Sequence, residues 1–189
     1  MGARLTFATF VLVVAALGAG ALAARGGQST LRAANLESAS IGSVRFGLTK
    51  ARAVAELTSL FGHPVARGRN TGCGARYTEV VWGDLAAEFR LNRFSGYRYV
   101  KGGYPITTPG SPRVPSPPKT PSPALATVKR VSLGSTLAQV RAAHGPLQRV
   151  GANAWRGSNR LVFVDDANRD PVRPTNRIVE IKVGTCGAF

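Results

Sequence analysis

The sequence predicts an α+β fold made of two tandem modules, each a helix packed on a three- to four-stranded antiparallel sheet, joined by a Pro-rich linker. Three observations support this: two helical patterns that each end at Gly and Pro, strand-like alternation after each helix, and a proline-rich interval between them. The chain divides into a signal peptide (1–24), a flexible N-terminal stub (25–40), a first α+β module (41–101), a disordered Pro-rich linker (102–127) and a second α+β module (128–189).

The N-terminus has the pattern of a secretory signal peptide. Arg4 precedes an uncharged, apolar stretch, Leu5–Ala24, in which Ala21 and Ala23 form an Ala-x-Ala cleavage pattern. The alternative is an uncleaved membrane anchor, because about 20 apolar residues can span a bilayer. We expect cleavage, and therefore a secreted or cell-envelope location.

Each module is expected to begin with a helix. The apolar or aromatic side chains recur at positions i, i+3 and i+7 in both: Val54, Leu57 and Phe61, then Leu137, Val140 and His144. Gly62 and Gly145 follow, each with a nearby Pro, and Gly suits the left-handed residue that ends many helices. Thr136 and Gln139 have the spacing of a capping box. The second helix is expected to be shorter by four residues, about one turn.

Three strands are expected after each helix. In the first module they are Tyr77–Trp82 and Leu85–Leu91, a hairpin around Gly83 and Asp84, followed by Gly96–Val100. In the second they are Val150–Trp155, a strand containing Leu161 and Phe163, and Arg177–Val183. Trp82 and Trp155 both close the first strand, so we interpret the two modules as an internal duplication.

The linker, residues 102–127, holds eight of the twelve prolines and no acidic residue. Proline fixes φ and removes a hydrogen-bond donor, so this composition predicts a semi-rigid, solvent-exposed spacer. A Pro-rich recognition motif is the alternative, because Pro115 and Pro118, and again Pro118 and Pro121, have Pro-x-x-Pro spacing.

The charge is strongly positive and evenly spread. The 189 residues include 25 Lys and Arg against 9 Asp and Glu, a formal net charge of +16. The intervals 41–101 and 128–189 each hold ten basic and four acidic residues. Such a field attracts anions and is sensitive to salt. We expect an acidic protein or an anionic cell-envelope polymer as the partner. Export argues against nucleic acid, and a membrane contact is expected only if the signal stays uncleaved.

One interval interleaves cations with aromatic side chains, and it supplies the candidate binding residues Arg90, Arg93, Tyr97, Arg98, Tyr99 and Lys101. Strand alternation puts the two tyrosines on one face and Arg98 on the other. Arg offers bidentate donors to phosphate or carboxylate, and Tyr offers a stacking surface. The alternative is that the tyrosines pack in the core while the arginines are solvated.

Little else suggests chemistry. Two Cys, two His and nine carboxylates exclude a zinc ribbon, a Cys-rich scaffold and a multi-carboxylate metal hydrolase. His63 and His144 lie at helix-end turns, and Asp166–Asp170 imitates the start of a calcium loop but lacks its Gly and terminal Glu. We expect no catalytic residue, metal or cofactor. Cys73 and Cys186 are expected to form an intramolecular disulfide, the alternatives being intermolecular pairing and free thiols.

The repeated order of helix, Gly, Pro and Trp-bearing strand resembles the tandem fold of the β-lactamase inhibitor protein (BLIP)-like family. It is also similar to the small outer-membrane lipoprotein family (SmpA/OmlA). The positions that carry the resemblance are Gly47, Thr49, Gly62, Pro64 and Trp82, with Gly134, Thr136, Gly145, Pro146 and Trp155. The resemblance implies an exported module that binds through a sheet surface. This chain lacks the inhibitor's disulfide in each repeat and the lipoprotein's acylated Cys, so neither activity transfers.

These observations lead to an exported, non-enzymatic binding module for an acidic protein or an anionic envelope polymer. The alternative is a membrane-anchored structural envelope factor, which requires an uncleaved signal. A secreted hydrolase is a third reading, and it would need a pocket that brings His63 or His144 to a Ser or Asp.

Overall fold

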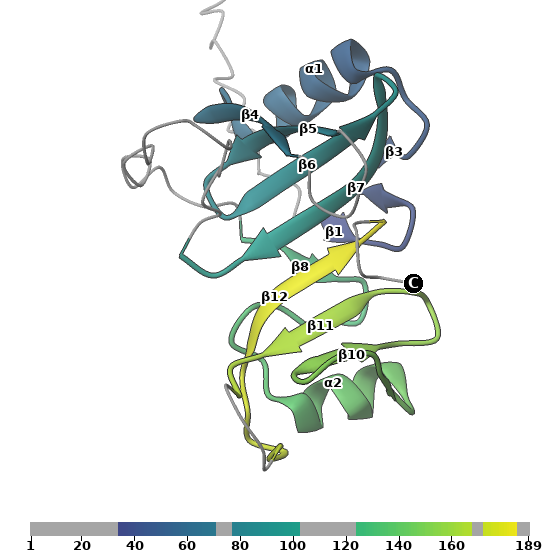
Figure 1. Ribbon diagram of the computed structural model, residues 1–189, viewed down its shortest axis with the longest axis vertical. Helices are drawn as coiled ribbons and strands as arrows, with labels where there is room; N and C mark the ends of the chain where they lie inside the picture. Colours follow the sequence, from purple (N-terminus) through teal and green to yellow (C-terminus); the bar gives the residue numbers. More distant parts are fainter. Residues whose placement is uncertain (1–33, 71–76, 103–123, 168–171, 185–189) are drawn as a thin grey trace, which may run out of the picture. The chain divides into compact units, whose positions relative to one another are not determined.

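Two helices and two sheets make up the part of the chain that the computed structural model describes, residues 34–70, 77–102, 124–167 and 172–184 (Figure 1). All of these residues belong to one compact unit, Leu31–Phe189. The helices are α1 (Lys50–Phe61) and α2 (Leu137–His144). The larger sheet contains β4 (Ala66–Asn70), β5 (Tyr77–Trp82), β6 (Leu85–Arg90), β7 (Arg93–Val100), β9 (Gln148–Arg149), β10 (Ala154–Arg156), β11 (Val162–Asp165) and β12 (Ile178–Val183). The smaller contains β1 (Asn35–Leu36), β2 (Ser40–Ile41), β3 (Val44–Arg45) and β8 (Ala126–Thr127).

The two expected modules share one eight-stranded antiparallel sheet, with strand order β4-β5-β6-β7-β12-β11-β10-β9. Each module supplies four consecutive strands, and the second half runs in reverse order. The halves meet where β7 pairs antiparallel with β12, from Val100 opposite Glu180 to Tyr97 opposite Val183. The α+β class is therefore confirmed, whereas the expectation of two separate small sheets is wrong. In separate modules, β7 and β12 would each be an exposed edge strand. Their pairing removes both exposed edges.

The registers place the two tryptophans at equivalent positions on either side of the β7–β12 junction. One row of directly opposed residues crosses six strands: Trp82, Leu85, Tyr99, Ile181, Phe163 and Trp155. Counted outward from β7 and β12, each tryptophan lies on the third strand of its own half. The correspondence between Trp82 and Trp155 that the sequence indicates is thus matched by their positions in the sheet.

The start of each helix is fixed to its module by the same hydrogen bonds. The amide of Gly47 donates to the carbonyl of Phe94, and the amide of Gly134 donates to that of Ile178. Three residues after each glycine, the amide of Lys50 donates to the carbonyl of Asn92 and the amide of Leu137 donates to the carbonyl of Asn176. Gly47 and Gly134 have φ of 89° and 85°, in the left-handed region that favours glycine. The two helix–sheet junctions are therefore alike in these contacts.

The helices end where the sequence predicts. They contain 12 and 8 residues, which confirms the expected difference of four. Gly62 and Gly145 cap their C-termini with φ of 80° and 77°. The capping box of α2 is present, because the Thr136 amide donates to Gln139 Oε1 at 2.8 Å and the Gln139 amide donates to Thr136 Oγ1 at 3.2 Å.

The strands agree with the sequence where alternation is clear. Strand β5 has the predicted bounds, and β6 ends one residue early because Leu91 and Asn92 form a tight turn with φ of 48° and 60°. Strand β7 starts three residues before the expected Gly96. The sequence reasoning did not identify β4 and β9, which are polar strands at the two margins of the sheet.

The smaller sheet uses residues that we assigned to unstructured segments. Residues 34–40 of the expected stub include β1, and Leu36 there is fully buried. Residues 124–127 of the expected linker include β8, which pairs parallel with β1 and follows the buried Leu125. Residues 34–40 and 124–127 are therefore not a flexible stub and a disordered linker. They form strands because their apolar side chains are buried in the core.

The core lies between one face of the large sheet and the elements that cover it. One buried cluster joins Trp82, Phe94 and Tyr97 of the sheet with Leu57 of α1 and Val140 of α2. It also contains the apolar residues Leu36, Ile41, Val44, Leu125 and Val131 from the small sheet and its neighbouring turn. Both helices and the small sheet therefore pack on the same face of the large sheet.

Several expectations fall outside the described residues: the signal peptide (1–24), most of the linker (103–123), and both Cys73 and Cys186. Cleavage of the signal, the semi-rigid character of the linker and the disulfide stay predictions. Among the described helices, neither is long and apolar enough to cross a membrane.

Gly96 tests the β7–β12 junction. A Cβ atom at this position would lie 2.7 Å from the carbonyl oxygen of Val183 on β12, closer than real contacts allow. We expect Gly96→Ala to lower the free energy of unfolding by about 1–3 kcal/mol, because the two strands must separate to admit the methyl group. Urea unfolding, with Ser158→Ala at an exposed loop position as control, measures the difference. Equal stability of the variant and the parent would contradict this account of the junction.

Candidate functional site

The six candidate binding residues do not form one surface. Tyr97 is fully buried and Tyr99 is 6% exposed, and both lie in the core cluster. The hydroxyl of Tyr97 donates to the carbonyl of Glu37 at 2.8 Å, and the hydroxyl of Tyr99 accepts from the amide of Leu125 at 3.4 Å. The tyrosines therefore tie the large sheet to the segments around β1 and β8, and they offer no stacking surface. The core-packing alternative holds for them.

Arg98 lies on the opposite face of β7, as alternation predicts, but it is engaged within the protein. Its Nε donates to Glu180 Oε1 on β12 at 2.7 Å, and Lys182 Nζ lies 3.6 Å from the other carboxylate oxygen of Glu180. All three side chains are largely shielded from solvent. This ion-paired group bridges the two modules at their junction.

Arg93 holds the start of α1. Its Nη1 donates to the carbonyl of Gly47 at 2.8 Å. In the second module Arg177 does the same, with Nη1 3.0 Å from the carbonyl of Gly134. The repetition of this contact indicates a structural role for Arg93, which sequence reasoning missed because the acceptor is a backbone carbonyl distant in sequence.

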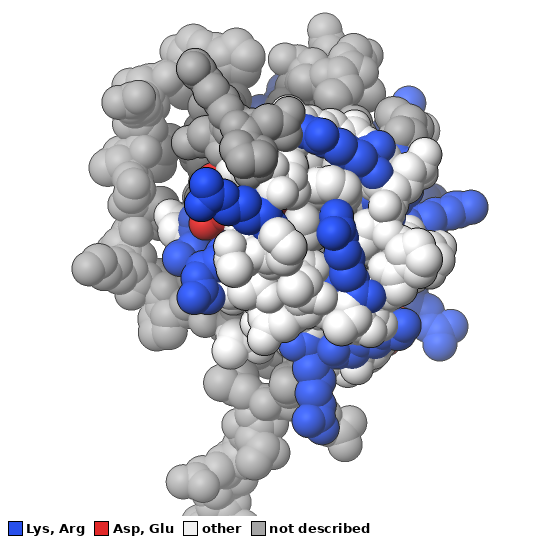
Figure 2. Space-filling view, turned by 90° about the horizontal axis from the view of Figure 1, so that it is seen from below, with Lys and Arg blue, Asp and Glu red and all other residues white. Residues whose placement is uncertain are grey.

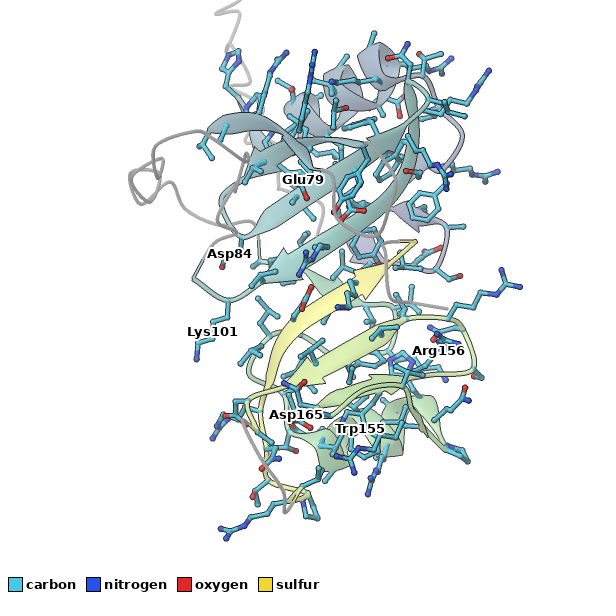
Figure 3. The ribbon with its side chains drawn as sticks, viewed as in Figure 1. Glu79, Asp84, Lys101, Trp155, Arg156 and Asp165 are labelled. Atoms are coloured by element: carbon cyan, nitrogen blue, oxygen red, sulfur yellow. The ribbon has the colours of Figure 1, made fainter. Side chains whose placement is uncertain are left out.

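Arg90 and Lys101 are exposed at opposite ends of β7. Arg90 is opposite Arg93 at the β6–β7 turn, whereas Lys101 follows the last residue of the strand. Figure 3 shows the Lys101 side chain pointing away from the sheet. These two cations contribute to the general surface charge and do not converge on one ligand position.

The face of the large sheet opposite the core carries buried carboxylates. Glu79 on β5 and Glu88 on β6 are direct cross-strand partners, 1% and 3% exposed (Glu79 is labelled in Figure 3). Burial and the neighbouring Glu79 raise the pKa of Glu88 to about 8, and Glu180 adds to this, although Arg98 and Lys182 oppose it. Oε1 of Glu88 is buried without a hydrogen-bond partner. Burial and the adjacent Glu79 therefore favour the protonated form of Glu88, since ionising two adjacent buried carboxylates is costly.

Burial of acids makes the surface more positive than the composition suggests. Of the eight described carboxylates, only Glu37 and Asp166 are exposed, and Glu79, Glu88, Asp165 and Glu180 are buried. Most described cations are exposed, namely Arg45, Arg52, Arg67, Arg69, Arg90, Arg93, Lys101, Lys129, Arg130, Arg141, Arg149, Arg160, Arg173 and Arg177. Figure 2 shows Lys and Arg spread over one end of the molecule with little acidic surface between them.

One group of cations gathers at the β4 margin of the sheet. Lys50 Nζ donates to Thr78 Oγ1 at 3.0 Å and lies over the ring of Phe89, 5.7 Å from its centroid. Arg69 is the strand partner of Thr78, and Arg67 lies two residues earlier. Burial, then Arg67 and Arg69, lower the pKa of Lys50. These three residues, which we call the β4 cation group, repel one another.

A second group surrounds Trp155 at the β9 margin. The guanidinium carbons of Arg141 and Arg149 lie 5.2 and 5.7 Å from the centre of the Trp155 ring. The indole Nε1 donates to the buried Asp165 Oδ2 at 2.8 Å, and both residues lie beside α2 in Figure 3. Arg149 also donates to the backbone carbonyls of Gly151 and Ala152. These contacts stabilise the end of the second module, and Arg149 is held by its own loop.

The two histidines lie in different surroundings. His144 is 6% exposed, its ring packs 4.9 Å from that of Phe163, and its Nε2 lies 3.3 Å from the buried Thr127 Oγ1. Burial, with a smaller effect of Lys129, lowers the pKa of His144. His63 is exposed. Among the described residues no three metal-binding side chains gather, and Asp166 Oδ1 accepts from the Arg177 amide. Residues 168–171 of the calcium-like interval are outside the described ranges.

Comparisons with known protein families, curated proteins and solved structures find no match to this chain. The resemblance to the β-lactamase inhibitor and outer-membrane lipoprotein families accordingly stays a prediction.

Glu88→Gln tests the buried pair through the pH dependence of stability. In the unfolded chain Glu88 has the ordinary pKa of 4.5, whereas in the folded protein it keeps its proton up to about pH 8. The stability that this shift contributes is present below pH 4.5 and is lost as the pH rises through 8. Gln keeps the shape without ionising. We therefore expect Glu88→Gln to be more stable than the parent by ~2–4 kcal/mol at pH 9 and by much less at pH 5.

Thermal or urea unfolding at the two pH values measures this effect. Glu56→Gln serves as the control, because Glu56 on α1 is only partly buried and pairs with the exposed Arg52. The control is expected to change stability by less than about 1 kcal/mol at both pH values, because exposed ion pairs contribute little. A Glu88→Gln variant with the same pH profile as the parent would show that Glu88 is ionised in the folded protein.

Arg93→Ala separates the structural role from a binding role. Loss of the hydrogen bond to Gly47 is expected to lower the free energy of unfolding by about 1 kcal/mol, and Arg177→Ala is expected to do the same. Arg90→Ala removes an equal charge from the same turn and should leave stability nearly unchanged. Binding to an anionic polymer should weaken equally in Arg90→Ala and Arg93→Ala. A much larger binding loss in Arg93→Ala would restore it as a specific ligand contact.

Proposed function

We propose that the protein is an exported, non-enzymatic binding protein that recognises an acidic protein or an anionic envelope polymer. The observation that carries this proposal is the division of charge: fourteen of the described cations are exposed, against two carboxylates. The cations extend over both modules and along both margins of the large sheet. A surface of nearly one sign attracts polyanions and speeds their association, most strongly at low salt.

The buried acids strengthen the argument. A carboxylate at the surface would partly neutralise nearby cations, whereas Glu79, Glu88 and Asp165 are enclosed by the fold. The β4 cation group keeps three positive side chains together at a cost in mutual repulsion. An anionic partner would remove that repulsion, which supports binding as the role of this surface.

The placement of the reactive side chains favours a non-enzymatic role. The imidazole of His144 is enclosed next to Phe163, and its polar contact is the buried hydroxyl of Thr127. A hydroxyl shielded in this way is inaccessible to substrate, so it cannot serve as a nucleophile.

A membrane-anchored structural envelope factor is the second candidate, and the apolar stretch Leu5–Ala24 favours it. The two candidates differ in the fate of this stretch. Recovery of the protein from cells with an N-terminus near residue 25 supports the binding protein, and retention of residues 1–24 with membrane association supports the anchored factor.

Salt dependence of capture tests the proposed function. We expect the purified protein to bind carboxylate-bearing and phosphate-bearing polymers and an acidic protein at low salt, and not a neutral polymer. A true partner should stay bound at about 0.15 M salt, where the Debye length is about 8 Å and contact rather than long-range attraction holds the complex. Absence of binding to every acidic ligand at low salt would contradict the proposal, and loss of all binding at 0.15 M would reduce it to non-specific charge attraction.

A further inference from the structure

Strand β4 leaves one side of its backbone unpaired by any described strand. It is the first strand in the order of the eight-stranded sheet, and it pairs only with β5 within the described ranges. Figure 1 shows it at the margin of the sheet, next to α1. An edge strand of this length, five residues, presents a row of backbone N–H and C=O groups to which an extended peptide can add.

The side chains of β4 make this edge selective. Arg67 and Arg69 are opposite Val80 and Thr78, so they lie on the face of the sheet that carries the core and α1. Alternate residues of a strand are about 7 Å apart on one face. Gly68 lies between them and has no side chain to obstruct the other face. The spacing of Arg67 and Arg69 therefore matches the spacing of alternate side chains on an extended peptide that pairs with β4.

Lys50 adds a third charge to the same row. It reaches the edge from the first turn of α1 and is held by Thr78, the strand partner of Arg69. Neither Arg67 nor Arg69 has an ion pair or a side-chain hydrogen bond with any described residue. The edge thus combines unpaired backbone with cations that no described carboxylate neutralises.

We propose that β4 is the docking site for an extended acidic segment of a partner protein, which adds to the sheet as a ninth strand with carboxylates at alternate positions facing Arg67 and Arg69. This inference rests on the proposed function and names its partner as an acidic peptide segment. Backbone hydrogen bonds favour a peptide over a polymer without amides. A second copy of this chain is disfavoured, because pairing β4 with β4 would bring four arginines together.

The opposite margin of the sheet does not fit such a segment. Strand β9 is two residues long, and the guanidinium of Arg149 donates to carbonyls of its own loop. The two margins are equivalent in topology, but only β4 combines length with side chains at strand period. Docking is therefore assigned to the first module.

The test uses the purified full-length protein and two labelled peptides with equal charge. In the first, Glu alternates with Thr; in the second, Glu alternates with Pro. The second peptide keeps the charge but lacks the backbone N–H at every second residue, and Pro is poorly tolerated within a paired strand. We expect the Glu–Thr peptide to bind at least about tenfold more tightly. Hydrogen exchange should slow at the amides of 66–70 when it binds.

Charge reversal supplies the matched protein variants. Arg67→Glu with Arg69→Glu should weaken Glu–Thr peptide binding by at least about tenfold, whereas Arg45→Glu with Arg173→Glu, which changes the net charge equally at distant exposed sites, should weaken it by less than about threefold. Both variants should keep the unfolding temperature of the parent, which shows that binding rather than folding changes.

Equal binding of the Glu–Thr and Glu–Pro peptides, or equal effects of the two double variants, would overturn strand addition at β4. If acidic polymers still bind in that case, the proposed function survives without this docking mode. If no acidic ligand binds at all, the proposed function itself fails. If Arg67 and Arg69 only prevent other strands from pairing with β4, neither peptide would bind, and the docking proposal would be wrong.

Discussion

The structure depends on the antiparallel pairing of β7 with β12, because this contact turns two small modules into one sheet with one core. Four residue pairs make the junction, and Gly96 allows the backbone of β12 to approach closely. Each module alone would leave an edge strand unpaired next to buried apolar residues, which is an aggregation hazard. With the edges joined, α1, α2 and the small sheet cover a single continuous face, and residues from both modules enter the same hydrophobic cluster.

The junction also determines where the charges lie. Arg98 and Glu180 come from different modules and pair only because their strands pair. The same face holds Glu79 and Glu88, so three of the eight described carboxylates are enclosed around the middle of the sheet. The cations lie mostly on turns, helix surfaces and sheet margins, where they stay solvated. The fold thus separates the two signs of charge, and a chain that is already strongly basic in composition acquires a surface of nearly one sign.

Local signals in the sequence predicted the local structure. Helix periodicity, the Thr136 capping box and the glycines after each helix gave the helices, and alternation gave β5 and β6. The strand junction was not predictable, since no spacing within β7 or β12 specifies a partner 80 residues away. The burial of Tyr97 and Tyr99 was not predictable either, because the residues that cover them come partly from 34–44 and 124–131. Most of these residues lie in segments that we had assigned to the stub and the linker. Arg93 was misjudged because a cation bonded to a carbonyl looks, in sequence, like a cation available to a ligand.

The two halves of the large sheet are alike where helix meets sheet and different at their outer margins. Both modules keep the residues that dock helix to sheet, including the equivalent contacts of Arg93 and Arg177, because those contacts hold each module together. The margins carry no such constraint. Strand β9 has two residues and lies beside a loop that engages Arg149, whereas β4 has five residues and two exposed arginines. The β7–β12 junction holds the two halves in one sheet, so the margins can differ in length and side chains without disturbing it.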